Sequence, residues 1–227
     1  MTRRAATLLL ALLLSLPAAA QSPPTAAEVE GYRDLLAATA GGDLRAMQRL
    51  LDTGDGWHGE RDRQGRTPLI VAGHRRDLAA AGLLIAAGAD VNALDHDRYD
   101  LLTIAAVNDD RDLLRLALKA GADAGQVTSP YDGTALIAAA HLGHVEVVRA
   151  LITAGAPLDH VNNLGWTALI EAVVLGDGGP RHTAIVRDLL AAGADPDIPD
   201  RGGKTARALA EDRGFDAMIE AFDRERR

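Results

Sequence analysis

Hydrophobic positions along this chain fall into two kinds of apolar segment, and both have helical spacing. The first kind is rich in alanine, with large and small residues three apart, as at Leu69 and Ala72. The second kind carries bulkier side chains, at Leu83-Leu84, Leu113-Leu114, Val147-Val148, Leu151-Ile152 and Leu189-Leu190. Apolar residues spaced by three or four positions predict amphipathic helices. The chain is therefore expected to be built from units of two helices, one lined with small side chains and one with larger ones.

A glycine followed by alanine closes each bulky segment at a nearly constant interval. These glycines are Gly88, Gly121, Gly155 and Gly193, which lie 33, 34 and 38 residues apart. Glycine just past a helix end supplies the left-handed residue that helix termini favour. A period in this range is typical of a stacked repeat array, in which each unit buries its apolar face against its neighbours.

The start of the first helix in each unit carries a matching landmark. Thr67 stands before Pro68, which predicts a hydroxyl cap followed by proline at the first helical position. The corresponding residues in the other units are Asp100, Thr134, Thr167 and Thr205. The longer last interval is explained by extra residues in Gly176–His182, a segment of loop-forming glycines and a proline. This extension either closes over a bound protein or is a neutral insertion.

These motifs together resemble the ankyrin repeat. Asp62, Gly65 and Thr67-Pro68-Leu69 match the family's first turn, and Gly143-His144 and Gly88-Ala89-Asp90-Val91-Asn92 match its later turns. The family's histidine after Thr-Pro-Leu is replaced by Ile70, Thr103, Ile137 and Ile170, which weakens individual turns without disturbing the period. The resemblance covers about residues 28–222. It implies an all-α solenoid of helix pairs with short β-turn or hairpin connections, with about six repeats including two terminal caps.

We divide the chain into a signal peptide at residues 1–20, a flexible linker at 21–27, and a repeat domain at 28–227. The repeat units are expected to start near residues 28, 62, 95, 129, 162 and 200. Arg3-Arg4, the apolar run Ala5–Leu16 and the small residues Ala18-Ala19-Ala20 follow the order of a cleavable secretory signal. The run is shorter than the roughly 20 residues that span a bilayer. We therefore expect cleavage near Ala20, no stable membrane anchor afterwards, and a periplasmic or secreted protein.

Composition and charge narrow the possible functions. The chain has no cysteine, and 32 acidic residues against 24 Lys and Arg give a net charge of −8. An acidic protein is poorly suited to bind phosphate backbones, so no nucleic-acid partner is expected. Sequence motifs of common hydrolases and phosphate-binding loops are missing, so no catalytic residue is assigned.

Two groups of polar residues could suggest a metal centre. His141 and His144 could share a metal ion, but His144 occupies the Gly-His turn position, where the resemblance implies a structural, hydrogen-bonded imidazole. Asp95 is expected to open a turn by accepting bonds from backbone amides. We therefore expect no metal and no cofactor.

The expected function lies in a surface. In the family that this chain resembles, the turn tips and the first helices form a concave face that contacts another protein. Here those positions carry Arg66, His96, Tyr99, Tyr131, His141, Leu142, Asn163, Leu164, Trp166 and Leu175. Exposed aromatic residues are typical of interface centres, and we expect Tyr99, Tyr131 and Trp166 to form such a ridge. The alternative is that Tyr99 and Trp166 lie over their own turns and shield backbone hydrogen bonds.

These observations predict a non-catalytic protein–protein interaction scaffold that is exported to the periplasm, acts as a monomer and binds a partner through its concave face. The alternative is a specific inhibitor or immunity protein for an exported enzyme. In both cases the partner is another protein, whose identity the residues do not specify.

Overall fold

The structure, a computed structural model, describes residues 23–54 and 57–225. The predicted signal peptide at 1–20 lies outside these residues. The first helices are α2 (Ala26–Glu30), α3 (Asp34–Gly41), α4 (Leu44–Thr53), η2 (Trp57–Gly59), α5 (Pro68–His74), α6 (Leu78–Ala86) and α7 (Leu101–Val107). The rest are α8 (Arg111–Lys119), α9 (Ala135–Leu142), α10 (Val145–Thr153), α11 (Ala168–Val174), α12 (Pro180–Ala191), α13 (Ala206–Arg213) and α14 (Asp216–Glu225).

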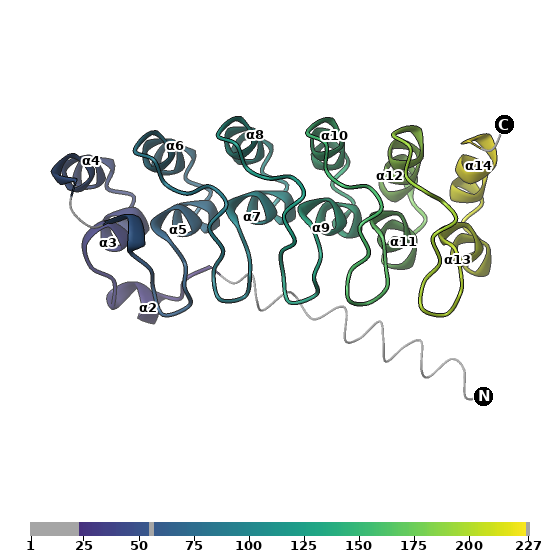
Figure 1. The fold of residues 1–227 in the computed structure, drawn as a ribbon, viewed down its shortest axis with the longest axis horizontal. Helices are drawn as coiled ribbons and strands as arrows, with labels where there is room; N and C mark the ends of the chain where they lie inside the picture. The colour runs from purple at the N-terminus through teal and green to yellow at the C-terminus, as the bar shows by residue number, and fades with distance from the viewer. Residues whose placement is uncertain (1–22, 55–56, 226–227) are drawn as a thin grey trace.

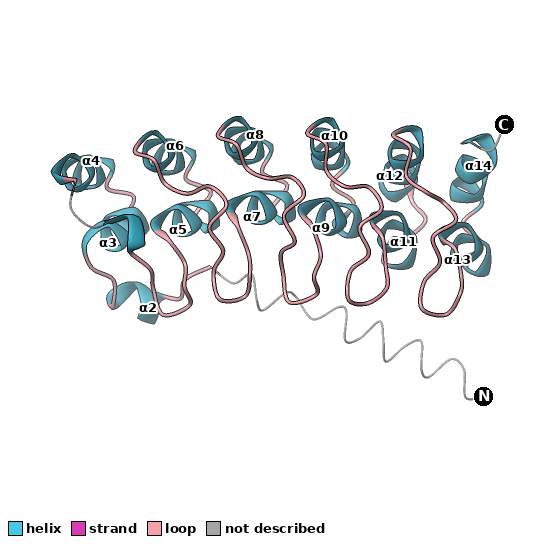
Figure 2. Cartoon of the chain, in the orientation of Figure 1, coloured by secondary structure: helices cyan, strands magenta, loops and turns pink. Residues whose placement is uncertain are grey.

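The helices form an elongated stack of antiparallel pairs in single file (Figure 1). One row holds the first helix of each pair, from α3 to α13, and the second row holds α4 to α14. Each helix contacts its own partner and the equivalent helices of the adjacent pairs. Long loops leave one side of the first row, and within the described part of the chain they contain isolated β-bridges but no strand (Figure 2). The predicted all-α solenoid of helix pairs is confirmed.

Local capping explains where the first helices begin. The side chains of Thr67, Asp100, Thr134, Thr167 and Thr205 each accept a hydrogen bond from the backbone amide three residues later. Each bond satisfies one of the amides that lack a partner in the first turn of a helix. The four closing glycines all have positive φ, between +79° and +96°. Both landmarks that were read from the repeat are therefore confirmed as capping positions.

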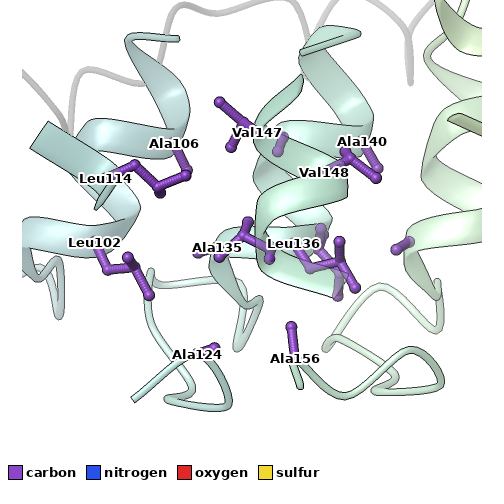
Figure 3. Packing of buried hydrophobic residues seen from close by; sticks show 14 of the residues in the cluster. Leu102, Ala106, Leu114, Ala124, Ala135, Leu136, Ala140, Val147, Val148 and Ala156 are labelled. Atoms are coloured by element: carbon purple, nitrogen blue, oxygen red, sulfur yellow. The ribbon is translucent and has the colours of Figure 1, made fainter. Parts of the chain in front are cut away.

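The core is a continuous layer between the two rows. Ala106, Leu114, Ala140 and Val148 are among the buried side chains that fill it, and they come from successive helices (Figure 3). Alanines on the first helices let neighbouring units approach closely, while leucine and valine on the second helices fill the space between the rows. At the carboxyl end, Met218 and Phe222 of α14 are fully buried against this layer. Helix α14 thus closes the stack with one buried and one polar face.

The amino-terminal end is closed by an element that the repeat pattern did not predict. Helix α2 starts at Ala26, with a capping box in which Thr25 and Glu28 each accept a bond from the other's backbone amide. The expected linker at 21–27 therefore overlaps the start of this helix. After α2, Tyr32 packs with Leu36 of α3 and Val71 of α5. None of the helices in the described residues is long and apolar enough to cross a lipid bilayer.

Candidate protein-binding surface

The loops at one side of the first helices form a row of tips, which we define as residues 62–66, 95–99, 129–133, 162–166 and 200–204. Hydrogen bonds join neighbouring tips. The amide of His96 donates to the carbonyl of Gln64 at 2.8 Å, and the amide of Asn163 donates to the carbonyl of Tyr131 at 2.9 Å. The amide of Ser129 donates to the carbonyl of Arg98, and the guanidinium group of Arg201 donates to the carbonyl of Asn163. The tips therefore form a continuous ledge beside the first helices. We call this ledge, together with the exposed parts of α5, α7, α9, α11 and α13, the inner face.

Each tip is shaped by the residue that opens it. The Asp95 carboxylate accepts from the amides of Asp97 and Tyr99 at 3.0 and 2.8 Å. The side-chain oxygen of Asn162 does the same for Leu164 and Trp166, at 3.0 Å each. Such bonds to residues two and four positions later hold a tight loop without help from a sheet. The predicted role of Asp95 as a turn-opening residue is confirmed.

Several of the predicted binding residues are accessible on the inner face. Tyr131 is 50% exposed in its tip, and Leu142, the last residue of α9, is 37% exposed. His96 and Asn163 are exposed on the tips, while His141, Leu164 and Leu175 are half-buried. These seven residues come from the second to the fourth of the five tips and from the ends of α9 and α11. Their binding role stays a prediction, but their positions allow it.

The expected exposure of Tyr99 and Trp166 is wrong. Tyr99 is 3% exposed and packs with Ile70 and Ile104, and Trp166 is 8% exposed within the main core. An aromatic ring buries a large apolar area, and the neighbouring helices supply the surface that covers these two. The exposed aromatic ridge therefore reduces to Tyr131. The alternative, in which Tyr99 and Trp166 lie over their own turns and shield backbone hydrogen bonds, agrees with this burial but stays a prediction.

Arg66 is also unavailable to a partner. Its guanidinium group contacts Asp62 at 2.6 Å and Glu28 of α2 at 3.1 Å, and it is buried. The Tyr32 hydroxyl donates to the same Asp62 carboxylate at 2.6 Å. Burial raises the pKa of Tyr32, and its bond to Asp62 acts in the same direction. This network fastens α2 to the first tip, which is a structural role that sequence position alone did not indicate.

Three histidines near α9 are each held by a backbone carbonyl. The ring of His144 is bonded to the carbonyl of Ala106 at 2.8 Å, so its predicted structural role is confirmed. His160 contacts the carbonyl of Asp132 at 2.6 Å. His182 contacts the carbonyl of His141 at 3.0 Å. Within residues 23–54 and 57–225, no group of three or more His, Asp or Glu side chains is arranged to hold a metal ion.

The extension at Gly176–His182 is packed against the stack. Pro180 is the first residue of α12, so part of the extension lengthens that helix to 12 residues, against 9 in α10. Gly178 has a φ of +71°, and a Cβ atom there would lie 2.5 Å from Phe215. His182 is buried and joins the segment to α9. These contacts hold the extension against α9 and Phe215, so it is poorly suited to close over a partner.

A buried acidic residue that was not predicted from the sequence lies behind the inner face. Glu171 lies in α11 and is 4% exposed. The equivalent positions of the other units hold Val71, Ile104, Ala138 and Leu209. One carboxyl oxygen accepts from the side-chain amide of Asn162 at 2.9 Å, whereas the other lies 3.8 Å from Nδ1 of His141. A charged residue at a position that is apolar in every other unit is the signal that could have identified it.

Burial shifts the pKa values of Glu171 and His141. It raises the pKa of Glu171 to about 7, because the charged form loses its hydration and the bond from Asn162 compensates only partly. The pKa of His141 is lowered, first by burial and then by electrostatic repulsion from the neighbouring His182 and His144 side chains. Both shifts favour the uncharged forms of the two groups.

Comparison with known proteins gives a consistent result. The family model for ankyrin repeats in three copies matches residues 102–220, and the single-repeat model matches residues 64–96. The ankyrin repeat protein YahD of Escherichia coli (strain K12) is 38% identical over 188 residues, which cover 82% of this chain and 92% of YahD.

Solved structures show the same similarity. A crystal structure of an ankyrin repeat domain from Acinetobacter baumannii AYE superposes with a TM-score of 0.80 and 41% identity, covering 84% of this chain and 96% of that domain. The ankyrin repeat domain of Bcl-3, a member of the IkappaB protein family, gives a TM-score of 0.77 at 27% identity, with 86% of each chain covered.

Proposed function

This chain belongs to the ankyrin repeat family, and we propose that it is a non-catalytic scaffold that binds another protein through its inner face, the concave face of the family. Ankyrin repeats are in general protein-interaction modules. The proposal adds that the protein acts as a monomer after export to the periplasm, with cleavage of the signal peptide near Ala20. The order of charged, apolar and small residues at positions 3–20 supports export.

One observation carries the binding proposal. Large apolar side chains remain exposed in the fourth and fifth units, where the inner face is not covered by α2. Tyr131 precedes α9 and Leu142 ends it, and Val161 lies beside the next tip with similar exposure. Partly exposed Leu164 and Leu175 lie in the following unit. Solvent-exposed aromatic and aliphatic residues on a ledge of polar tips are typical of the centre of a protein interface.

The binding proposal is tested by photo-crosslinking in the native host. A photoreactive phenylalanine analogue at position 131 should yield a discrete crosslinked partner, and Leu142→Arg should abolish that product without changing the melting temperature. The same analogue at position 78 is the control, because Leu78 has a similar exposure but begins a helix of the second row. Equal crosslinking from both positions, or an unchanged yield in Leu142→Arg, would refute binding through the inner face.

The identity of the crosslinked protein also separates the two functional alternatives. An inhibitor or immunity protein requires an enzyme as its partner, and addition of the purified repeat protein should then lower that enzyme's activity. A scaffold would leave any such activity unchanged.

Export is tested separately by mass spectrometry of the protein from fractionated cells. We expect the mature chain to begin at Gln21 and to be found in the periplasmic fraction. A cytoplasmic chain that retains residues 1–20 would reject the export proposal and leave the binding proposal standing.

A further inference from the structure

Glu171 holds a carboxyl oxygen that the fold does not satisfy. Among the buried side-chain nitrogen and oxygen atoms of the described residues, Oε2 of Glu171 is the atom without a hydrogen-bond partner. Leaving such a group unpaired in the interior costs free energy, and a charged group costs more than a neutral one. The other units avoid this cost with apolar residues at the same position. The fifth unit therefore carries a polar group that its own packing does not require.

The carboxyl group has a fixed orientation. Asn162, which opens the neighbouring tip, donates from Nδ2 to Oε1 of Glu171 at 2.9 Å. The same Asn162 is held by its bonds to the tip backbone. This arrangement directs the unpaired Oε2 towards His141, whose Nδ1 lies 3.8 Å away, which is too far for a hydrogen bond.

His141 is the least restrained of the histidines around this carboxyl group. Its side chain is 38% exposed, and its ring forms no hydrogen bond with any residue that the structure describes. His144, His160 and His182 are all bonded to backbone carbonyls. Rotation of the His141 ring therefore breaks no hydrogen bond. Because His141 is the partly exposed residue next to Oε2, such a rotation would open a path from the inner face to Glu171.

The surroundings of this path suit a long side chain with a positive end. Leu142 is exposed next to His141, and Leu175 lies one turn beyond Glu171, with its amide bonded to the Glu171 carbonyl at 3.0 Å. Apolar contacts of this kind hold the aliphatic part of lysine or arginine. The carbonyl end of α9 adds partial negative charge near the opening. The negative net charge of the chain would also attract a basic partner.

The charged groups on the neighbouring elements do not supply the missing partner. His182 of α12 contacts Asp177, and Arg207 of α13 is paired with Asp223 and Glu211. Of the other titratable groups in this part of the stack, His144 and His160 are bonded to backbone carbonyls, Lys204 is paired with Asp212, and Arg201 donates to the carbonyl of Asn163. A cation for Glu171 would therefore come from outside the chain.

We propose that Glu171 is the acceptor for one lysine or arginine side chain of the partner protein, and that His141 occupies its place in the free protein. This inference rests on the proposed function and specifies the chemistry that the inner face recognises. The basic side chain enters between His141 and Leu175, displaces the imidazole ring, and forms an ion pair with Oε2. Asn162 keeps the carboxyl group oriented for this contact.

Binding should depend on pH, because only the ionised carboxyl group attracts the cation. With the pKa of Glu171 at about 7, the ionised fraction rises by about 30-fold between pH 5.5 and pH 8. Affinity for a basic side chain is therefore expected to increase with pH across this range.

The test uses capped tripeptides Gly-Lys-Gly and Gly-Arg-Gly as probes, with Gly-norleucine-Gly as the uncharged control. Carbon-13-labelled histidine side chains of the purified protein are followed by NMR at pH 8 and pH 5.5. We expect saturable shifts of the His141 signal with the basic peptides at pH 8, and roughly 30-fold weaker binding at pH 5.5. Norleucine should produce no saturable shift.

Three variants make the result specific. Glu171→Gln should abolish binding of the basic peptides, whereas Glu146→Gln, which removes an exposed carboxylate in the preceding unit, should not change it. His141→Ala should tighten binding, followed through the His144 signal, because the site is then open. Equal shifts in Glu171→Gln, equal binding of norleucine, or no binding by both the wild type and His141→Ala would each overturn the inference. Crosslinking at position 131 could still succeed in that case, so the two proposals can fail independently.

Discussion

Replacing Glu171 by glutamine should make the protein more stable at neutral and alkaline pH. Glutamine has nearly the same shape and keeps an oxygen that can accept from Asn162. It carries no charge at any pH. The substitution therefore removes the titration of this buried group and little else, which makes the pH dependence of the effect more informative than its size at one pH.

The sign follows from the direction of the shift. The folded-state pKa of about 7 lies above the ordinary value of 4.5, so the native protein holds this proton more tightly than the unfolded chain. The contribution of Glu171 to the free energy of unfolding is therefore fully present below pH 4.5 and is lost as pH rises from 4.5 through 7. A shift of this size corresponds to about 3 kcal/mol, since one pKa unit is worth about 1.4 kcal/mol.

Urea unfolding, followed by circular dichroism between pH 5 and 8.5, measures the effect. The difference in unfolding free energy between Glu171→Gln and wild type should be about 1 kcal/mol at pH 5 and should reach about 3 kcal/mol in favour of the variant above pH 8. His74, whose pKa burial lowers to about 4, titrates in both proteins and cancels in the difference. Glu146→Gln is the matched control, because its ion pair with Arg149 is exposed to solvent and is expected to contribute little to stability at any pH.

A difference that stays constant with pH would show that Glu171 titrates normally in the folded protein. The account of its burial would then be wrong. A variant less stable than wild type above pH 8 would have the same consequence.

Two further substitutions test the ends of the stack. Arg66→Ala leaves the buried Asp62 carboxylate without its guanidinium partner. We expect the free energy of unfolding, measured with urea, to fall by about 3 kcal/mol, and hydrogen exchange in α2, measured by mass spectrometry, to become faster. Unchanged exchange would show that the ion pairs do not hold α2. Gly178→Ala forces a Cβ atom against Phe215 at a positive φ. We expect the free energy of unfolding to fall by at least about 1 kcal/mol, with a lower melting temperature. An unchanged melting temperature would mean that the extension is not packed as described.

The residues that were predicted correctly are those whose role depends on near neighbours in the chain. Thr67 caps α5 through a bond to Ile70, only three residues away, and Asp95 opens its tip through bonds to Asp97 and Tyr99. Helix α2 could have been found in the same way, because its capping box is the local pair Thr25 and Glu28. We did not predict helix α2, because we placed the helices by the repeat period, which α2 does not share.

The errors concern residues whose environment comes from another unit. Arg66 was expected on the surface, but Glu28, its partner 38 positions earlier, is brought to it by α2. Tyr99 was expected to be exposed, but Ile70 of the preceding unit covers it. Exposure of a tip residue depends on how closely the next unit approaches, which the residue's own segment does not specify.

The local order of caps, apolar spacing and closing glycines determined the helix pairs and their stacking, because each of these signals acts within a few residues or repeats at a constant phase. The packing of units against one another decided which inner-face side chains meet solvent. It also placed His141 of one unit beside Glu171 of the next, 30 positions later, and buried the carboxyl group between them. A contact across two units follows from how the helices pack in space, and no pattern within either segment contains it.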